Sequence, residues 1–292
     1  MLKLLPLNTR AKDGRTVGAV EDKDGNAEGL LRVYDKSIKD GVPLIELPDG
    51  LTFAPTPETR AREVDCIYVT GGSGAGKSTW CALYTKHFIN AFKSKPEDII
   101  IITNDSIEDP AYSFPHKHIT IDDDMIANPI TLEELTAPNG HSLVIFDDIE
   151  GVRAGKLLKA VEALTTSVLT MGRKHGINCI FISHRSASGN FTKNILNELN
   201  SVVWFPQLST SRNLTYMLTK HLGMPEGLRE ALKDKGWGRW IRLMTKAPQI
   251  IQSEKRSAIY DYDECVTALK KKSIIDKKRH QMEAKDMLAI AH

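Results

Sequence analysis

Residues 71–79 have the types and spacing of a loop that binds phosphate. They read Gly-Gly-Ser-Gly-Ala-Gly-Lys-Ser-Thr and fit the pattern G-x-x-x-x-G-K-[ST]. Glycines let the backbone turn so that several N–H groups point at one phosphate, and the start of a helix adds its positive dipole end. The predicted nucleotide-binding residues are Gly71, Gly72, Ser73, Gly74, Ala75, Gly76, Lys77, Ser78 and Thr79.

The last residues of this loop carry separate chemistry. Lys77 would reach the β- and γ-phosphates of ATP and act in catalysis, and the Ser78 hydroxyl would be a ligand of Mg²⁺. An apolar run over 66–69 precedes the loop, and a helical run over 80–92 follows it. This is the strand–loop–helix context that the motif requires. The alternative is a glycine-rich turn that binds nothing.

A second part of the site is predicted downstream, where Ser142 and four apolar residues over 143–146 lead into Asp147 and Asp148. A buried strand would carry Asp147 to the phosphates as a Mg²⁺ ligand. Asp148 would then position or deprotonate the attacking water. The alternative is a strand that simply ends in a polar turn.

The elements that must position these residues alternate between strand and helix from about residue 61. This alternation predicts an α/β fold with a mainly parallel central sheet flanked by helices. We expect strands over 66–70, 98–103, 118–121, 142–146, 179–182 and 201–205. We divide the chain into a small β-rich N-terminal element (1–60), a P-loop ATPase core (61–255) and a basic helical tail (256–292).

Three further polar positions follow predicted strands. His184, at the tip of the strand over 179–182, could sense the γ-phosphate or be structural. Asn104, which follows the strand over 98–103, could be coupled to the carboxylates, although a polar strand end needs no function. The carboxylates at 122–124 could bind a metal, but this pattern more often marks a turn or a helix start.

Composition narrows the function class only moderately. The chain has 292 residues, 41% of them hydrophobic and 26% charged, which predicts a folded and soluble core. We expect no membrane span, because no apolar run approaches the ~18 residues that a span needs. The four cysteines lack the spacing of a zinc site or a disulfide framework. The net charge of +2 does not identify a partner, but basic clusters lie at 270–272 and 277–279.

The order of these motifs resembles the FtsK/HerA superfamily. The loop and the Asp-Asp strand are followed by Gly-Arg-Lys-His-Gly-Ile-Asn-Cys-Ile-Phe-Ile-Ser-His-Arg over 172–185. Within the superfamily, the chain looks like the genome-packaging ATPases of large DNA viruses and virophages, over about residues 66–255. It departs from the family at His184, where Gln is usual, and at Asp148, where cellular members usually have Glu.

The resemblance implies a homo-oligomeric ring that hydrolyses ATP and translocates double-stranded DNA, contacting its phosphates without sequence specificity. It implies that Arg173 reaches the nucleotide of a neighbouring subunit, with Arg185 as a second candidate for this role. Arg173 could instead be a cation that complements a helix C-terminus. A capsid vertex protein is an expected partner. The expected location is the host-cell cytoplasm, a virus factory or the virion, without secretion.

Two other function classes stay open. A P-loop kinase or other small-molecule phosphotransferase would use the same loop without a ring. An FtsK/HerA-type DNA pump in conjugation, or a protein of virion assembly, would share the core as well. Stimulation of ATP hydrolysis by duplex DNA would separate a DNA motor from a kinase.

Overall fold

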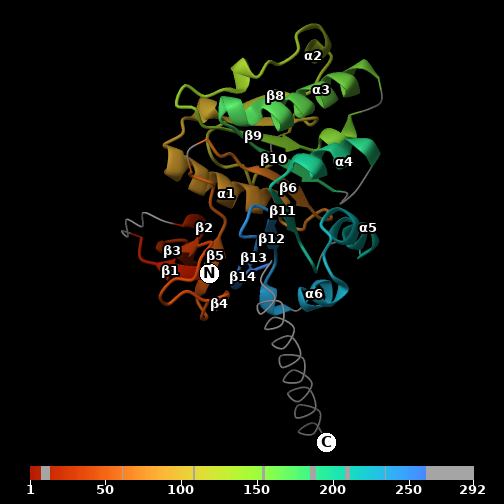
Figure 1. Cartoon of the computed structure of the whole chain (residues 1–292). Helices are drawn as coiled ribbons and strands as arrows, with labels where there is room; N and C mark the ends of the chain where they lie inside the picture. The colour runs from red at the N-terminus through yellow and green to blue at the C-terminus, as the bar shows by residue number, and fades with distance from the viewer. Residues whose placement is uncertain are drawn as a thin grey trace, which may run out of the picture.

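A ten-stranded sheet forms the centre of the molecule, with helices on both of its faces and a separate four-stranded sheet beside it (Figure 1). This computed structural model describes residues 1–7, 14–60, 62–107, 109–152, 155–184, 189–207, 211–233 and 235–260. The architecture confirms the predicted α/β fold of a P-loop NTPase with a small β-rich N-terminal sheet.

Six neighbouring strands of the large sheet are parallel, in the order β11-β6-β10-β9-β7-β8. β7 is Ile-Ile-Ile-Ile-Thr and is buried along its length, as expected for a parallel strand covered on both faces. The bounds of the parallel strands are β6 Cys66–Thr70, β7 Ile99–Thr103, β8 Lys117–Thr120, β9 Ser142–Asp147, β10 Ile177–Ser183 and β11 Ser201–Trp204.

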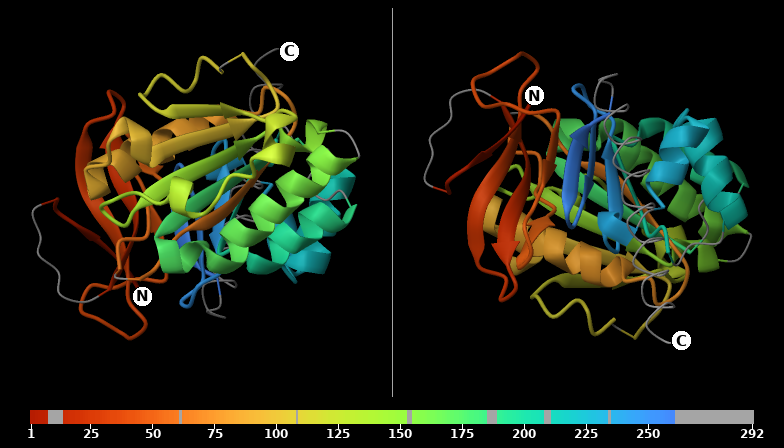
Figure 2. Two further views of the ribbon diagram at one scale, coloured as in Figure 1. Left: turned by 90° about the horizontal axis from the view of Figure 1, so that it is seen from above. Right: turned by 90° about the horizontal axis from the view of Figure 1, so that it is seen from below.

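The helices cover the two faces unequally (Figure 2). α1 (Lys77–Phe92) packs its aromatic side chains against one face, where Trp80, Tyr84 and Phe88 are buried. α3 (Lys156–Met171) and α4 (Gly189–Glu198) cover the other face. The remaining helices are α2 Asp124–Ala127, α5 Ser211–Tyr216, a π-helical turn Met217–His221, and α6 Glu226–Ala231. Single 3₁₀ turns are Pro96–Asp98, Glu133–Leu135, Ile149–Gly151, Gly172–His175 and Lys235–Trp237.

An antiparallel extension completes the large sheet beyond β11. Its strands are β12 Ile241–Met244, β13 Ile250–Ser253, β14 Arg256–Ile259 and β4 Leu44–Glu46. β4 comes from the first 60 residues, so the N-terminal part of the chain contributes to both sheets. The first residues of the predicted basic helical tail (256–292) form the strand β14 instead, because they pair with β13 and β4. The basic clusters at 270–272 and 277–279 lie outside the described residues.

The N-terminal sheet is antiparallel, in the order β1-β3-β2-β5. Its strands are β1 Leu2–Leu5, β2 Arg15–Asp22, β3 Ala27–Val33 and β5 Leu51–Ala54. Apolar side chains of this sheet form a core with Met244, Ile250 and Ile259 of the antiparallel extension. The N-terminal sheet is therefore packed against the edge region of the ATPase core rather than free of it.

The carboxylates at 122–124 form a helix start. Asp122 accepts a hydrogen bond from the Asp124 N–H over 3.0 Å, and α2 begins at Asp124. Within the described ranges, no group of three or more His, Cys, Asp or Glu side chains is arranged to hold a metal ion. No helix in those ranges is long and apolar enough to cross a membrane.

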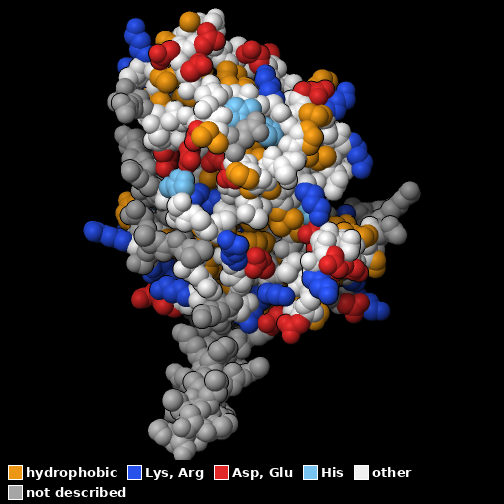
Figure 3. Space-filling view, turned by 180° about the vertical axis from the view of Figure 1, so that it is seen from behind, with side chains coloured by type: hydrophobic (Ala, Val, Ile, Leu, Met, Phe, Trp, Pro, Cys, Tyr) orange, Lys and Arg blue, Asp and Glu red, His pale blue; other side chains and the backbone are white. Residues whose placement is uncertain are grey.

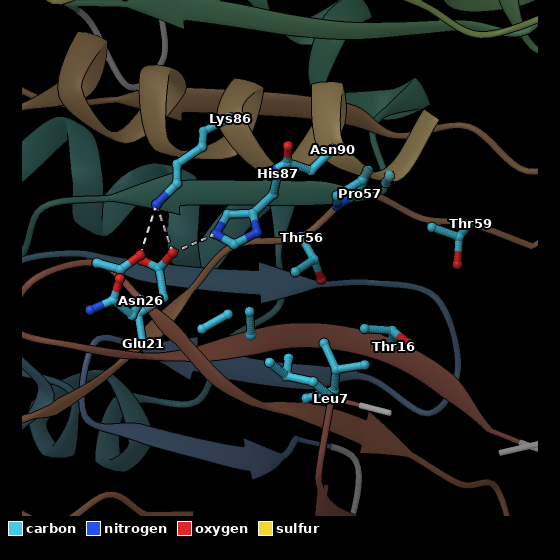
Figure 4. A pocket seen from close by; sticks show the side chains of 15 residues that line it. Leu7, Thr16, Glu21, Asn26, Thr56, Pro57, Thr59, Lys86, His87 and Asn90 are labelled. Atoms are coloured by element: carbon cyan, nitrogen blue, oxygen red, sulfur yellow. Dashed lines mark hydrogen bonds and ion pairs between the residues drawn. The ribbon is translucent and has the colours of Figure 1, made fainter. Parts of the chain in front are cut away.

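An ion-pair network around the buried Glu21 carboxylate joins the N-terminal sheet to α1 at a cavity of about 570 Å³ (Figure 4). The Glu21 carboxylate on β2 lies 3.0 Å from Lys86 Nζ and 3.2 Å from His87 Nε2, both on α1. Burial raises the pKa of Glu21, but the hydrogen bonds from His87 and Lys86 outweigh it, so the pKa lies below its ordinary value. The charged carboxylate therefore stabilises the docking of this sheet.

We predict that Glu21→Gln lowers the free energy of unfolding by about 1–2 kcal/mol at pH 7, because hydrogen bonds to a charged group are lost. Since the pKa of Glu21 is lower in the folded state, its contribution is present above the unfolded pKa of about 4.3 and is lost as the pH falls. Urea titrations at pH 7 and below pH 4 should show the difference between the two proteins vanish in acid. Glu230→Gln is the matched control, because its ion pair with Lys233 is exposed.

Candidate nucleotide-binding site

The loop between β6 and α1 has the backbone that a phosphate cradle needs. Gly74 and Gly76 have φ of 72° and 99°, a region that favours glycine. A Cβ on Gly76 would also lie only 3.0 Å from the Arg239 guanidinium, so a side chain there would crowd this arginine. α1 begins at Lys77, directly after this turn, with no acidic side chain in its first turn. Its unpaired N–H groups and positive dipole end are therefore available to an anion.

Lys77 is folded back over the loop. Its Nζ donates hydrogen bonds to the carbonyl oxygens of Gly71 and Gly72, over 3.0 and 3.1 Å. The same Nζ lies 3.1 Å from Nδ1 of His184. Burial lowers the pKa of Lys77, while the charges of Asp148 and Asp147 oppose this shift. The amine is therefore held between the loop and the carboxylates, at the place where the phosphates of a nucleotide would enter.

Parallel strands bring the other predicted residues to the same edge. β10 pairs with both β6 and β9, and the three strands end beside one another. Side chains alternate between the two faces of a sheet, so residues two positions apart share a face. Asp147 lies two positions after Ile145, which packs on the α1 face. His184 likewise continues the alternation of Ile180 and Ile182. Asp147 and His184 therefore reach the face that carries Lys77.

Asp148 would point to the opposite face if the strand continued, but its backbone turns. Its φ of 51° and ψ of 24° are left-handed, a conformation that costs an L-residue about 1–2 kcal/mol. The turn directs the carboxylate back toward the phosphate loop, where Oδ1 lies 2.8 Å from His184 Nε2. His184 thus connects Lys77 through one ring nitrogen and Asp148 through the other. Backbone strain at this point is typical of a functional site.

Asp147 is fixed by Tyr112, a residue of the loop between β7 and β8. The Tyr112 hydroxyl donates to Asp147 Oδ2 over 2.7 Å and is also hydrogen-bonded to Ser78. Burial raises the pKa of Asp147, and the Tyr112 hydrogen bond partly offsets this. Ser78 and Asp147 thus lie within reach of one hydroxyl group. A hydroxyl and a carboxylate oxygen at this spacing form a donor set that suits Mg²⁺.

These groups line one cavity of about 410 Å³. Its walls come from the phosphate loop on one side and from the strand ends on the other. The lining residues are Ser73, Gly74, Gly76, Lys77, Ser78, Thr79, Asp109, Ala111, Asp147, Asp148, His184 and Arg239. The cavity therefore combines anion-binding N–H groups, cations and carboxylates.

Arg173 lies outside this cavity. It sits in the turn before β10, at the opposite end of that strand from His184. The seven residues of β10 separate the two ends by about 20 Å. Arg173 instead lines a cleft of about 740 Å³ with Arg62, His141 and Lys174. Its guanidinium is exposed and has no partner among the residues that the structure describes.

Two other sequence candidates have different outcomes. The Asn104 side chain lies beside Gly151, where a Cβ would meet Nδ2 at 3.0 Å, in the turn after the carboxylates. No hydrogen bond from Asn104 to either carboxylate is formed in the described part of the chain. Arg185 lies outside the described residues.

Sequence reasoning missed Tyr112, Asp109 and Arg239. Tyr112 and Asp109 come from a connection without a motif, and no spacing rule links that connection to β9. Arg239 comes from the turn before β12, 163 positions after Gly76 by residue number. Nothing in the residues Trp-Gly-Arg-Trp over 237–240 indicates their place beside the loop.

One curated relative establishes the family. No protein-family model matches this chain. The chain is 30% identical over 257 residues to "Uncharacterized protein V3" of Sputnik virophage, covering 86% of this chain and 96% of that protein. The chain belongs to the family of this virophage protein. The viral and virophage family that the motifs indicated is thereby confirmed.

Solved structures with some similarity include two ATPases of different systems. The genome packaging NTPase B204 of Sulfolobus turreted icosahedral virus 2, in complex with AMP, is 13% identical with a TM-score of 0.45, covering 63% of this chain and 94% of that chain. The pCW3 conjugation coupling protein TcpA with ATPγS is 14% identical with a TM-score of 0.43, covering 88% and 82%. At such low identity, the activity of this protein has to be inferred from its own site.

The left-handed turn at Asp148 makes a prediction about stability. Asp148→Asn should leave the free energy of unfolding within about 0.5 kcal/mol of the wild type, because Asn tolerates this conformation. Asp148→Val should lower it by about 1–3 kcal/mol, because a β-branched residue is a genuine outlier there. Denaturant titration measures both values. Equal stabilities of the Val and Asn variants would show that the turn is not strained in solution.

Proposed function

We propose that this protein is an ATP-hydrolysing motor that translocates double-stranded DNA and packages a viral genome into a preformed capsid. The observation that carries the proposal is the single cavity that brings Lys77, Ser78, Asp147, Asp148 and His184 together. This set supplies phosphate binding, a metal site and a carboxylate for water, which are the requirements of ATP hydrolysis. Membership of a virophage protein family supports the viral role.

The phosphate loop would bind the β- and γ-phosphates of ATP. Ser78 and Asp147 would hold Mg²⁺, which when bound neutralises charge on the phosphate oxygens. Lys77 would exchange its bonds to Gly71 and Gly72 for bonds to phosphate oxygens. Tyr112 keeps the half-buried Asp147 carboxylate oriented toward Ser78. These residues account for nucleotide binding.

Asp148 would orient the attacking water and accept its proton. His184 would link this step to the nucleotide state, because its ring contacts both Asp148 and Lys77. When Lys77 moves to the phosphates, His184 loses one partner and can turn toward the γ-phosphate. This is the role that a polar residue at the tip of this strand has in the sequence-based hypothesis.

Arg173 would act on the nucleotide of a neighbouring subunit in a homo-oligomeric ring. Its distance from its own site supports action in trans, because the length of β10 lies between them. Among the described residues the guanidinium has no partner, so it is available to a neighbouring subunit. An arginine supplied in trans stabilises charge that develops on the transferred phosphoryl group. The ring and its capsid partner are parts of the proposal.

DNA contact would be made to phosphates, since a motor must move along any sequence. The face seen in Figure 3 shows Lys and Arg side chains interspersed with Asp and Glu rather than a uniform basic surface. We therefore assign the DNA contacts to pore loops of the ring. The basic clusters at 270–272 and 277–279 are an auxiliary candidate outside the described residues.

The first test is steady-state ATP hydrolysis with and without linear duplex DNA. We expect strong stimulation by DNA that weakens steeply as salt increases, because phosphate contacts release counterions. Lys77→Ala should abolish the hydrolysis. Full turnover by Lys77→Ala would exclude the assigned site. Robust hydrolysis that ignores DNA would favour a small-molecule phosphotransferase instead.

The second test concerns Arg173. Arg173→Ala alone should lose about 10³-fold or more in turnover, as should Lys77→Ala. Mixing the two variants should restore part of the activity. An Arg173→Ala subunit keeps its Lys77 and can receive Arg173 from a neighbouring Lys77→Ala subunit. Lys174→Ala is the matched control, since it removes the adjacent cation of the same cleft. An active Arg173→Ala homo-oligomer would remove this residue from the mechanism.

A further inference from the structure

Arg239 is a cation in the nucleotide cavity that the proposed hydrolysis does not use. It precedes β12, whose first residue Ile241 pairs with Trp204 of β11. Trp204 in turn pairs with Thr70, the last residue before the phosphate loop. Arg239 therefore reaches the loop from the β11 side. The residues assigned to hydrolysis reach it from the β9 and β10 side.

The contacts of Arg239 place its guanidinium flat against the phosphate loop. Its Nε donates to the carbonyl oxygen of Ala75 over 3.2 Å. Its Nη2, Cζ and Nε would lie 3.0 to 3.2 Å from a Cβ on Gly76, so a side chain there would push the guanidinium away from the loop. The two terminal nitrogens have no protein partner among the described residues. They are free to donate into the cavity that Arg239 lines.

The main chain of Arg239 is held in place from two directions. Its N–H donates to Oε2 of Glu254 over 2.8 Å, just beyond β13. The next residue, Trp240, packs edge-on against Trp80 of α1, with ring centroids 6.2 Å apart. The C-terminal hairpin and the helix that follows the loop therefore fix this arginine together. Such preorganisation is typical of a side chain that binds a ligand.

We propose that Arg239 binds the α-phosphate and nucleoside half of the nucleotide, and thereby sets affinity rather than the rate of hydrolysis. This inference rests on the proposed nucleotide site. The reacting γ-phosphate must lie toward Asp148 and His184, so the α-phosphate and the nucleoside must extend to the other side of the loop. Arg239 is the cation on that side. A guanidinium can donate two N–H groups to phosphate oxygens and stack on a base.

The test compares three probes by isothermal titration calorimetry: ATP, ADP and inorganic tripolyphosphate. Arg239→Gln should weaken ATP and ADP binding by the same factor, about 10- to 100-fold, because a hydrogen-bonded charge is lost. Tripolyphosphate binding should weaken by a smaller factor, since this probe keeps a phosphate at the α position but lacks a nucleoside. Turnover at saturating ATP should stay within about threefold. Lys233→Gln, which removes an exposed cation paired with Glu230, is the matched control.

Each other outcome overturns the inference. A loss for ATP but not ADP would place Arg239 on the γ-phosphate. An equal loss for tripolyphosphate would exclude the proposed contact with the nucleoside. Unchanged affinities would exclude contact with the nucleotide. If the wild-type protein bound neither ATP nor ADP, the proposed function itself would fail, whereas binding by the wild type with an unaffected Arg239→Gln variant would defeat only this inference.

Discussion

The parallel pairing of β6, β10 and β9 is the constraint on which the site depends. Because these strands run in the same direction, the phosphate loop, the tip of β10 and the two carboxylates meet at one edge of the sheet. A slip of one residue in β9 or β10 would turn Asp147 or His184 to the α3 face. Buried isoleucine, valine and phenylalanine side chains on both faces hold this register.

Several charged groups lie close together at the carboxyl edge of the sheet. Without specific partners, like charges there would repel one another and buried charges would lose their hydration. Asp147 is half-buried, and the hydroxyl of Tyr112 offsets part of the cost of its desolvation. Lys77 is buried and uses loop carbonyls and His184. The left-handed turn at Asp148 completes the set by joining a second carboxylate to His184. Bound nucleotide would rearrange these pairs, which makes the site responsive to its occupant.

The elements outside the parallel sheet support the loop mechanically. Asp65, just before β6, accepts a hydrogen bond from Tyr84 of α1 over 2.7 Å and lies 3.7 Å from the Arg242 guanidinium of β12. Trp80 and Trp240 pack between the same two elements. The N-terminal sheet reaches α1 through Glu21, Lys86 and His87. The helix that begins at the phosphate loop is thus tied to both ends of the chain that the structure describes.

The sequence by itself determined the class of fold and the place of the glycine-rich loop between a strand and a helix. The strand–loop–helix motif, the Asp-Asp strand and the alternation of strands with helices are local patterns, because burial and turn geometry act over a few neighbouring residues. They also predicted that His184 lies at a strand tip. Local patterns do not contain the distances between segments. Contacts between residues that are far apart in the sequence could therefore not be predicted.

Only the tertiary structure decided which distant residues join the site. In the structure Tyr112 donates a hydrogen bond to Asp147, and Arg239 lies against Gly76. Arg173 lies at the opposite end of β10 from the site. The tertiary structure also turns Asp148 toward His184 through a left-handed backbone conformation, which the residue type alone does not predict. These results depend on strand order and on the paths of connections. Both follow from the packing of the whole core rather than from any local run of residues.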